Sequence, residues 1–113
     1  MSGSGGGRDE GPTSSGGPST GDPCLRVRRG PINSPKAGVI TGLAVGGVLT
    51  VAVQMAGSAP ILVVQDAAGS VAGSLTFVGY LEIVDCIQNR GVAYRAVVVA
   101  IAGGVVEVRV EPV

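Results

Sequence analysis

A short basic cluster contains the residues of this chain that are best suited to binding a charged partner. Arg26, Arg28 and Arg29 lie within four residues of one another, and guanidinium groups bind phosphates and carboxylates well. They are therefore candidate contacts for nucleic acid or for an acidic protein. Tyr80 is a further candidate, because an exposed tyrosine can stack on a base. A simpler interpretation also exists for both features: charges protect an edge strand from aggregation, and a tyrosine packs on a sheet.

Catalytic chemistry is not indicated by the residue types present. The chain has no histidine, so neither a common zinc site nor a Cys–His pair can form. Glu82 and Asp85 have the spacing of a solvated helix face, and Asp85 disfavours a thiolate at the neighbouring Cys86. The glycines do not form a phosphate-binding motif. We therefore predict that the protein is not an enzyme and has no cofactor, no metal and no catalytic residue.

The two cysteines, Cys24 and Cys86, bear on the compartment in which the protein works. The N-terminal residues contain no apolar segment like that of a secretory signal, so we expect a reducing compartment and a cytoplasmic location. In that setting Cys24 is a thiol near the domain edge and Cys86 is a small packed hydrophobe. A disulfide between them is an open alternative that no feature of the sequence favours.

Composition divides the chain into a tail and a body. Met1–Pro23 consists mainly of Gly, Ser, Pro and Thr and has too little apolar surface to offset the entropy of folding, so we expect it to be disordered. Residues 24–113 are the predicted domain. The net charge is zero, but five of the eight basic residues lie at or before Lys36. The body therefore lacks the positive field expected of a dominant nucleic-acid binder.

The apolar pattern of the body predicts short strands separated by turns. Ile61–Gln65 is a continuous apolar run, which is typical of a strand buried on both faces. Asp66–Gly69 then forms a hairpin turn, with Gly69 in a left-handed conformation. In total, the strands expected in this half of the body are Leu25–Arg28, Val39–Thr41, Val48–Gln54, Ile61–Gln65 and Ser70–Leu75.

One helix is expected after these strands. Thr76 is suited to cap a helix that begins at Phe77, although Gly79 in its first turn favours a start nearer Tyr80. Gly91 supplies the C-terminal stop. The face expected to point to the core consists of Phe77, Leu81, Val84 and Ile87.

A hairpin closes the predicted fold. Val92–Ala102 and Val105–Val110 flank the two-residue turn Gly103-Gly104. Val106, Val108 and Val110 are expected to face inward, because side chains alternate along a strand. These elements predict a mainly β domain with one helix, arranged as a small antiparallel β-barrel or an open barrel.

The order of elements resembles the HIRAN domain, a small barrel found alone or attached to DNA-processing enzymes. The resemblance covers roughly fifty residues and is carried by Ile61–Val64, Gly69, Val71–Leu75, Tyr80–Ile87 and Tyr94–Val98, with Val45–Val51 similar to the first strand of the family. It implies a barrel fold and the binding of single-stranded DNA ends. Met55–Pro60 replaces the polar and aromatic loop through which family members bind DNA, so no functional residue is carried over.

An uncharged stretch leaves a membrane-associated alternative open. Ala37–Val64 carries no formal charge, and Gly38, Gly42 and Gly46 have the spacing that lets membrane helices approach closely. In this alternative Ala37–Val53 inserts into the membrane as a helix and the glycine row mediates self-association. The β-branched bias of the stretch favours a buried strand instead.

We therefore expect a non-catalytic interaction module. Its favoured partner is a protein or a second copy of the chain rather than a small molecule. Weak nucleic-acid binding through Arg26, Arg28 and Arg29 follows from their charge and from the HIRAN resemblance, and membrane association is the alternative.

Overall fold

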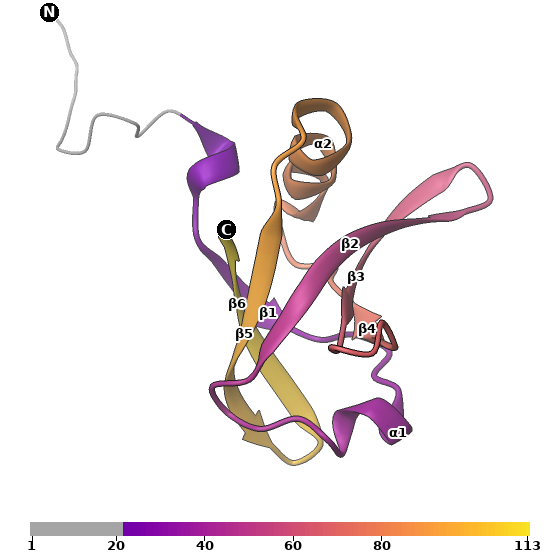
Figure 1. Cartoon of the computed structure of the whole chain (residues 1–113), viewed down its shortest axis with the longest axis vertical. Helices are drawn as coiled ribbons and strands as arrows, with labels where there is room; N and C mark the ends of the chain where they lie inside the picture. Colours follow the sequence, from indigo (N-terminus) through magenta and orange to yellow (C-terminus); the bar gives the residue numbers. More distant parts are fainter. Residues whose placement is uncertain (1–21) are drawn as a thin grey trace, which may run out of the picture.

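Six antiparallel strands form one sheet in the computed structural model, which describes residues 22–113 (Figure 1). In spatial order the strands are β1 (Arg28–Pro31), β6 (Val105–Pro112), β5 (Tyr94–Ala102), β2 (Val48–Ala56), β3 (Ala59–Gln65) and β4 (Val71–Ser74). The sheet is open: its edge strands β1 and β4 are not paired, and beyond the end of β1 Asn33 forms an isolated bridge with Ser74 of β4. The mainly β prediction is confirmed, in its open form and not as a closed barrel.

The closing hairpin follows the predicted alternation. Val106, Val108 and Val110 are buried, while Arg109 between them is exposed. Gly103 and Gly104 both have positive φ, at 58° and 81°, as the turn of a two-residue hairpin requires. The turn sets the β5–β6 register from Ala102 to Ala100, and an irregularity between Val98 and Ala100 shifts it by one residue for the rest of the hairpin. The alternation sets which face of β6 is buried.

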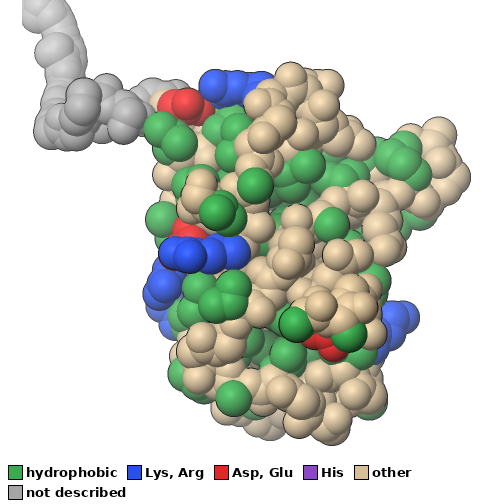
Figure 2. Space-filling model, in the orientation of Figure 1, with side chains coloured by type: hydrophobic (Ala, Val, Ile, Leu, Met, Phe, Trp, Pro, Cys, Tyr) green, Lys and Arg blue, Asp and Glu red, His purple; other side chains and the backbone are tan. Residues whose placement is uncertain are grey.

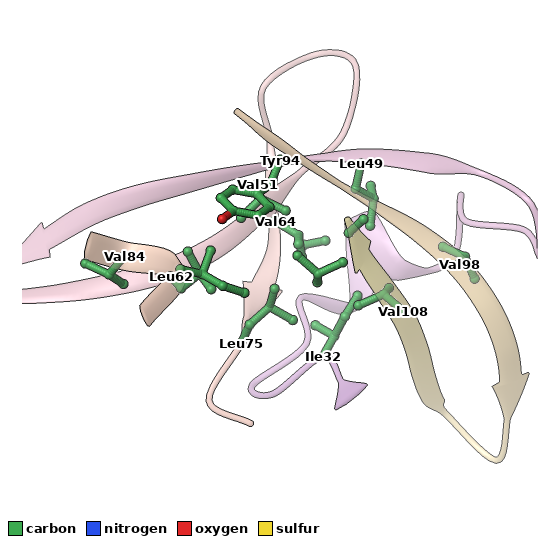
Figure 3. Close-up of a cluster of buried hydrophobic side chains, with 14 of the residues drawn as sticks. Ile32, Leu49, Val51, Leu62, Val64, Leu75, Val84, Tyr94, Val98 and Val108 are labelled. Atoms are coloured by element: carbon green, nitrogen blue, oxygen red, sulfur yellow. The ribbon is translucent and has the colours of Figure 1, made fainter. Parts of the chain in front are cut away.

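The core is mainly aliphatic and includes the ring of Tyr94 (Figure 3). Leu62 and Val64 on β3 are fully buried, and Val63 between them is also buried, so the prediction of a strand covered on both faces is confirmed here. Among residues 22–113, no polar or charged residue is buried. Burial of apolar surface is therefore the dominant stabilising contribution to this unit.

Helix α2 (Tyr80–Arg90) packs against the sheet through a face that overlaps the predicted one. It begins at Tyr80, after Gly79 with φ of 91°, and not at Phe77. Of the predicted face, Val84 is buried, and Phe77 and Ile87 pack against the core. Ile83 and Cys86 are also buried, so the inward face is rotated away from Leu81, which is 57% exposed. Thr76 does not cap the helix, because its hydroxyl bonds to Asn33 Oδ1 at 2.6 Å.

The predicted strand Val39–Thr41 is wrong. This segment forms the one-turn helix α1 (Ala37–Ile40), in which the Lys36 carbonyl accepts hydrogen bonds from the amides of Val39 and Ile40. Gly46 then turns the chain with φ of 91° and β2 follows, so Ala37–Val53 is not the single helix that the membrane alternative requires. No helix within residues 22–113 has the length and apolar composition needed to cross a membrane.

The start of the described chain departs from the predicted strand Leu25–Arg28. A short 3₁₀ helix, η1 (Pro23–Leu25), comes first, and Asp22 caps it by accepting a hydrogen bond from the Cys24 amide at 2.9 Å. The strand β1 begins only at Arg28. The predicted disorder of the tail concerns residues that lie outside the described range, apart from Asp22 and Pro23.

Candidate binding groove

A groove of about 560 Å³ lies along the open seam of the sheet. The Asn33–Ser74 bridge lies at one end of this seam. From the bridge, the segment of β1 that contains Gly30 lies beside the segment between β4 and α2 that contains Phe77. Phe77 packs so closely over Gly30 that an added Cβ there would lie 2.8 Å from the ring. The groove opens further along this seam, and its walls are Arg26, Arg28 and the continuous segment Thr76–Glu82.

The structure brings three of the four predicted binding residues together in this groove: Arg26, Arg28 and Tyr80. Arg29 lies elsewhere, since neighbouring residues of a strand point to opposite faces. Its guanidinium Nε is 3.3 Å from Glu107 Oε2 on β6. The three arginines therefore do not line one groove, which contains only Arg26 and Arg28; their role in binding stays a prediction.

Arg28 has a structural partner within the groove. Its side chain is only 13% exposed, and its Nη2 forms an ion pair with Glu82 Oε1 of α2. The same nitrogen also lies 3.4 Å from the Pro23 carbonyl oxygen. Arg28 thus links η1, β1 and α2, and its charge is largely balanced by Glu82. Arg26 is exposed at the other end of this wall.

Apolar side chains also line the groove. Val78 is 98% exposed and Leu81 is 57% exposed, while Phe77 and Tyr80 are half-buried and pack against the core. Sequence reasoning missed Val78 and assigned Leu81 to the core. Gly79 was the available signal for Val78, because a helix that starts just after Gly79 leaves Val78 in the preceding loop.

A disulfide holds the N-terminal end of the groove in place. Cys24 and Cys86 are bonded to each other across 62 positions of the chain, and both are buried. The prediction of two separate thiols is therefore wrong. The spacing of two distant cysteines does not show that η1 folds back onto α2, so the sequence alone did not indicate the bond. The bond anchors the segment that leads into Arg26.

Two further contacts reinforce this anchor. The Tyr94 hydroxyl donates a 2.7 Å hydrogen bond to the Cys24 carbonyl oxygen, and burial raises the pKa of Tyr94 above its ordinary value. Asp22 accepts a hydrogen bond from the Cys24 amide and pairs with Arg90 Nη1 at 3.1 Å. The amide first and the arginine second lower the pKa of Asp22, so this carboxylate stays ionised at neutral pH.

Two other hollows offer less for binding. One, of about 460 Å³, lies between the segment before β2 and the turn after β3, and its single ionisable group, Asp66, bonds to the amides of Ala68 and Ser70. The other, of about 180 Å³, is small and contains Lys36. The first hollow also contains Val48, which is 59% exposed, but it has no basic side chain, and neither hollow has two exposed apolar side chains beside an arginine as the seam groove does.

No metal-binding constellation occurs in the part of the chain that the structure describes, since no three Cys, Asp or Glu side chains there are grouped closely enough. Comparison with known proteins adds no assignment to this geometry. No family model matches the chain, and neither a curated protein nor a solved structure is similar to it.

Proposed function

We propose that this chain is a non-catalytic interaction module whose seam groove binds a protein segment with apolar and acidic side chains. The observation that carries this proposal is that Val78 and Leu81 are strongly exposed and line the same hollow as Arg26. Exposed apolar groups gathered around a concave surface are typical of interaction sites.

The apolar wall would provide most of the affinity. Fully covering a valine or leucine side chain contributes about 1.5–3 kcal/mol, and Val78 is almost completely exposed in the free chain. Phe77 and Tyr80 are already held by the core, so a ligand contacting them would not have to order them. A partner segment with two or three apolar side chains would therefore bind with useful strength.

The charges in the groove favour an acidic partner. Arg28 and Glu82 balance each other, and Arg26 leaves an excess positive charge at the groove. A carboxylate on the partner next to Arg26 would gain a charge-assisted hydrogen bond. Complementarity of this kind contributes to specificity and to the association rate more than to affinity.

Nucleic-acid binding, suggested by the HIRAN resemblance, is the weaker proposal. Affinity for nucleic acid rises with the number of phosphates that Lys and Arg neutralise. Arg28 and Arg29 are paired with acidic side chains, which leaves Arg26 as the main phosphate contact among the predicted residues. We expect such binding to be weak and to disappear at moderate salt.

The disulfide also changes the proposal for where the module acts. A cytoplasmic location was predicted on the premise of reduced thiols, and Cys24–Cys86 is bonded instead. Disulfides persist mainly in oxidising compartments. We therefore favour an oxidising compartment over the cytoplasm.

Selection from a library of random displayed peptides tests the proposed function. We expect enriched peptides to combine Asp or Glu with large apolar residues, and to bind the Leu81→Ser variant at least about tenfold more weakly. Val105→Ser is the matched control, because Val105 is 56% exposed, almost equal to Leu81, and lies outside the groove.

A second pair of variants tests the charge. Arg26→Gln should weaken binding of the acidic peptides, whereas Lys36→Gln, which removes an exposed charge away from the groove, should not. If no peptide is enriched, or if Leu81→Ser and Val105→Ser bind the peptides equally, the proposal is wrong. Enrichment that depends on single-stranded DNA carried through the selection would support the nucleic-acid version instead.

A further inference from the structure

The distal half of β2 has an edge that no strand covers. Against β3, β2 is paired from Thr50 to Ala56. Against β5 on its other side, its pairing stops at Thr50. Figure 1 shows the consequence: the tip of the β2–β3 hairpin projects from the body of the domain. A two-stranded ribbon on its own is only marginally stable in water.

The alternation of the ladder identifies which backbone groups are unpaired. The Val98 amide donates to the Gly47 carbonyl oxygen at 2.9 Å, so Gly47 faces β5. Every second residue after Gly47 faces the same way, and the pairing with β5 ends before it reaches Val51, Val53 and Met55. Their N–H and C=O groups therefore point away from β3. Met55 is opposite Pro60 on β3. Because proline has no N–H to donate to Met55, this pair fits an arrangement in which the main-chain groups of Met55 point away from β3.

Other edges of the sheet carry the features by which proteins prevent strand pairing. The edge strand β1 contains two arginines and Pro31, and β3 begins next to Pro60. The distal edge of β2, Val51–Ala56, contains neither a charge nor a proline. Figure 2 shows the projecting hairpin without acidic or basic side chains. An edge of this kind is competent to pair with another strand.

We propose that this edge pairs antiparallel with the same edge of a second copy of the chain. The segment has no charge to repel its copy, and a two-fold axis near Val53 would pair the free main-chain groups of the two edges. Val51 is buried and Val53 packs against the core, so Met55, which is 57% exposed, is the side chain on this face that is free to contact the second copy. Pairing of identical edges uses both edges and closes, so it gives a dimer and not a fibre.

The dimer should be weak. Pairing through one short strand buries less than the roughly 1,200 Å² that marks the lower end of standard interfaces. Gln88 Nε2 of α2 lies 3.9 Å from Met55 Sδ at this edge, and because this contact is exposed it would not prevent a strand from approaching. We therefore expect dissociation constants between about 10 µM and 1 mM.

Amide hydrogen exchange of the full chain at rising protein concentration tests the pairing without any mutation. The Val53 and Met55 amides should exchange about two- to sevenfold more slowly at about 1 mM than at about 10 µM, the range that dissociation constants of about 1 mM to 10 µM give. The Gln54 amide should not change, because it faces β3 at both concentrations. If Val53 and Met55 exchange equally fast at both concentrations, the proposed pairing is wrong.

A matched pair of charged variants tests the same edge by analytical ultracentrifugation. Met55→Lys should raise the dissociation constant at least about tenfold, whereas Val105→Lys should leave it unchanged. Met55 is 57% exposed and Val105 is 56% exposed, so the two changes are equally easy for the fold to accept. A wild-type chain that is monomeric throughout, or a Met55→Lys dimer of equal affinity, would overturn the proposal. Leu81→Ser should not affect the dimer, so failure of the groove would leave this result intact.

Discussion

Removal of the Cys24–Cys86 disulfide should be the most destabilising simple change to this domain. The proposed perturbation is the double variant Cys24→Ala, Cys86→Ala, which avoids leaving one buried free thiol. The disulfide spans 62 positions, and closing a loop of that length removes chain entropy from the unfolded state equivalent to about 4 kcal/mol. Small domains typically have a total stability of about 5–15 kcal/mol, so the loss would be a large fraction of it.

Equilibrium unfolding in urea measures this effect. With a dependence on urea of about 1.5–2 kcal/mol per molar, the midpoint of the double variant should lie about 2–3 M below that of the oxidised wild type. A reducing agent should lower the wild-type midpoint to a similar value and should have no effect on the double variant, which serves as its control.

Two results would refute this reasoning. One is a difference in unfolding free energy below about 1 kcal/mol between the oxidised wild type and the double variant, since a loop of this length predicts several times more. The other is the detection of two free thiols in the native protein purified without reducing agent. Either result would mean that η1 is held against α2 by packing and ion pairs alone.

Three further changes probe the same fold. Tyr94→Phe leaves the buried Cys24 carbonyl without its 2.7 Å hydrogen bond and should cost about 1–3 kcal/mol in urea unfolding; a cost below about 0.5 kcal/mol would contradict this. Gly73→Ala places a Cβ 2.7 Å from the Asn33 carbonyl oxygen and should cost about 1–3 kcal/mol, whereas Gly38→Ala, which meets nothing within 4 Å, should not destabilise. The pKa of Asp22 is lowered by folding, so its contribution is present above the pKa of the unfolded chain and is lost as pH falls through the folded value. Asp22→Asn should therefore reduce the loss of stability below about pH 4. If the free energy of unfolding falls with decreasing pH as steeply in the variant as in the wild type, this would count against the Cys24 and Arg90 contacts.

Local patterns in the sequence were sufficient to predict most of the sheet. The valines of β6 alternate with polar residues, and Gly103-Gly104 is a two-residue turn, so the burial and the hairpin followed from the chain itself. The prediction failed at the segment of α1, where apolar composition favoured a strand. The backbone of this segment instead forms the local hydrogen bonds of one helical turn. The turn follows a long-range contact, in which the Lys36 amide donates a hydrogen bond to the Ala72 carbonyl oxygen.

The candidate site was only partly predictable, for the same reason. Arg26, Arg28 and Tyr80 were chosen for their chemistry, and the fold brings them together because the chain after β4 runs back along β1. Nothing local showed that Arg28 would pair with Glu82, 54 residues away. The disulfide depends on the same long-range arrangement, which composition and spacing do not encode.

The seam groove is tested most directly by following the backbone amide resonances of the full chain during titration with the tightest-binding selected peptide. We predict chemical-shift changes at Arg26 and at the amides from Val78 to Glu82, with the β2–β3 hairpin unaffected. Changes confined to the hairpin, or to the hollow beside Asp66, would contradict the assignment of the groove as the binding site.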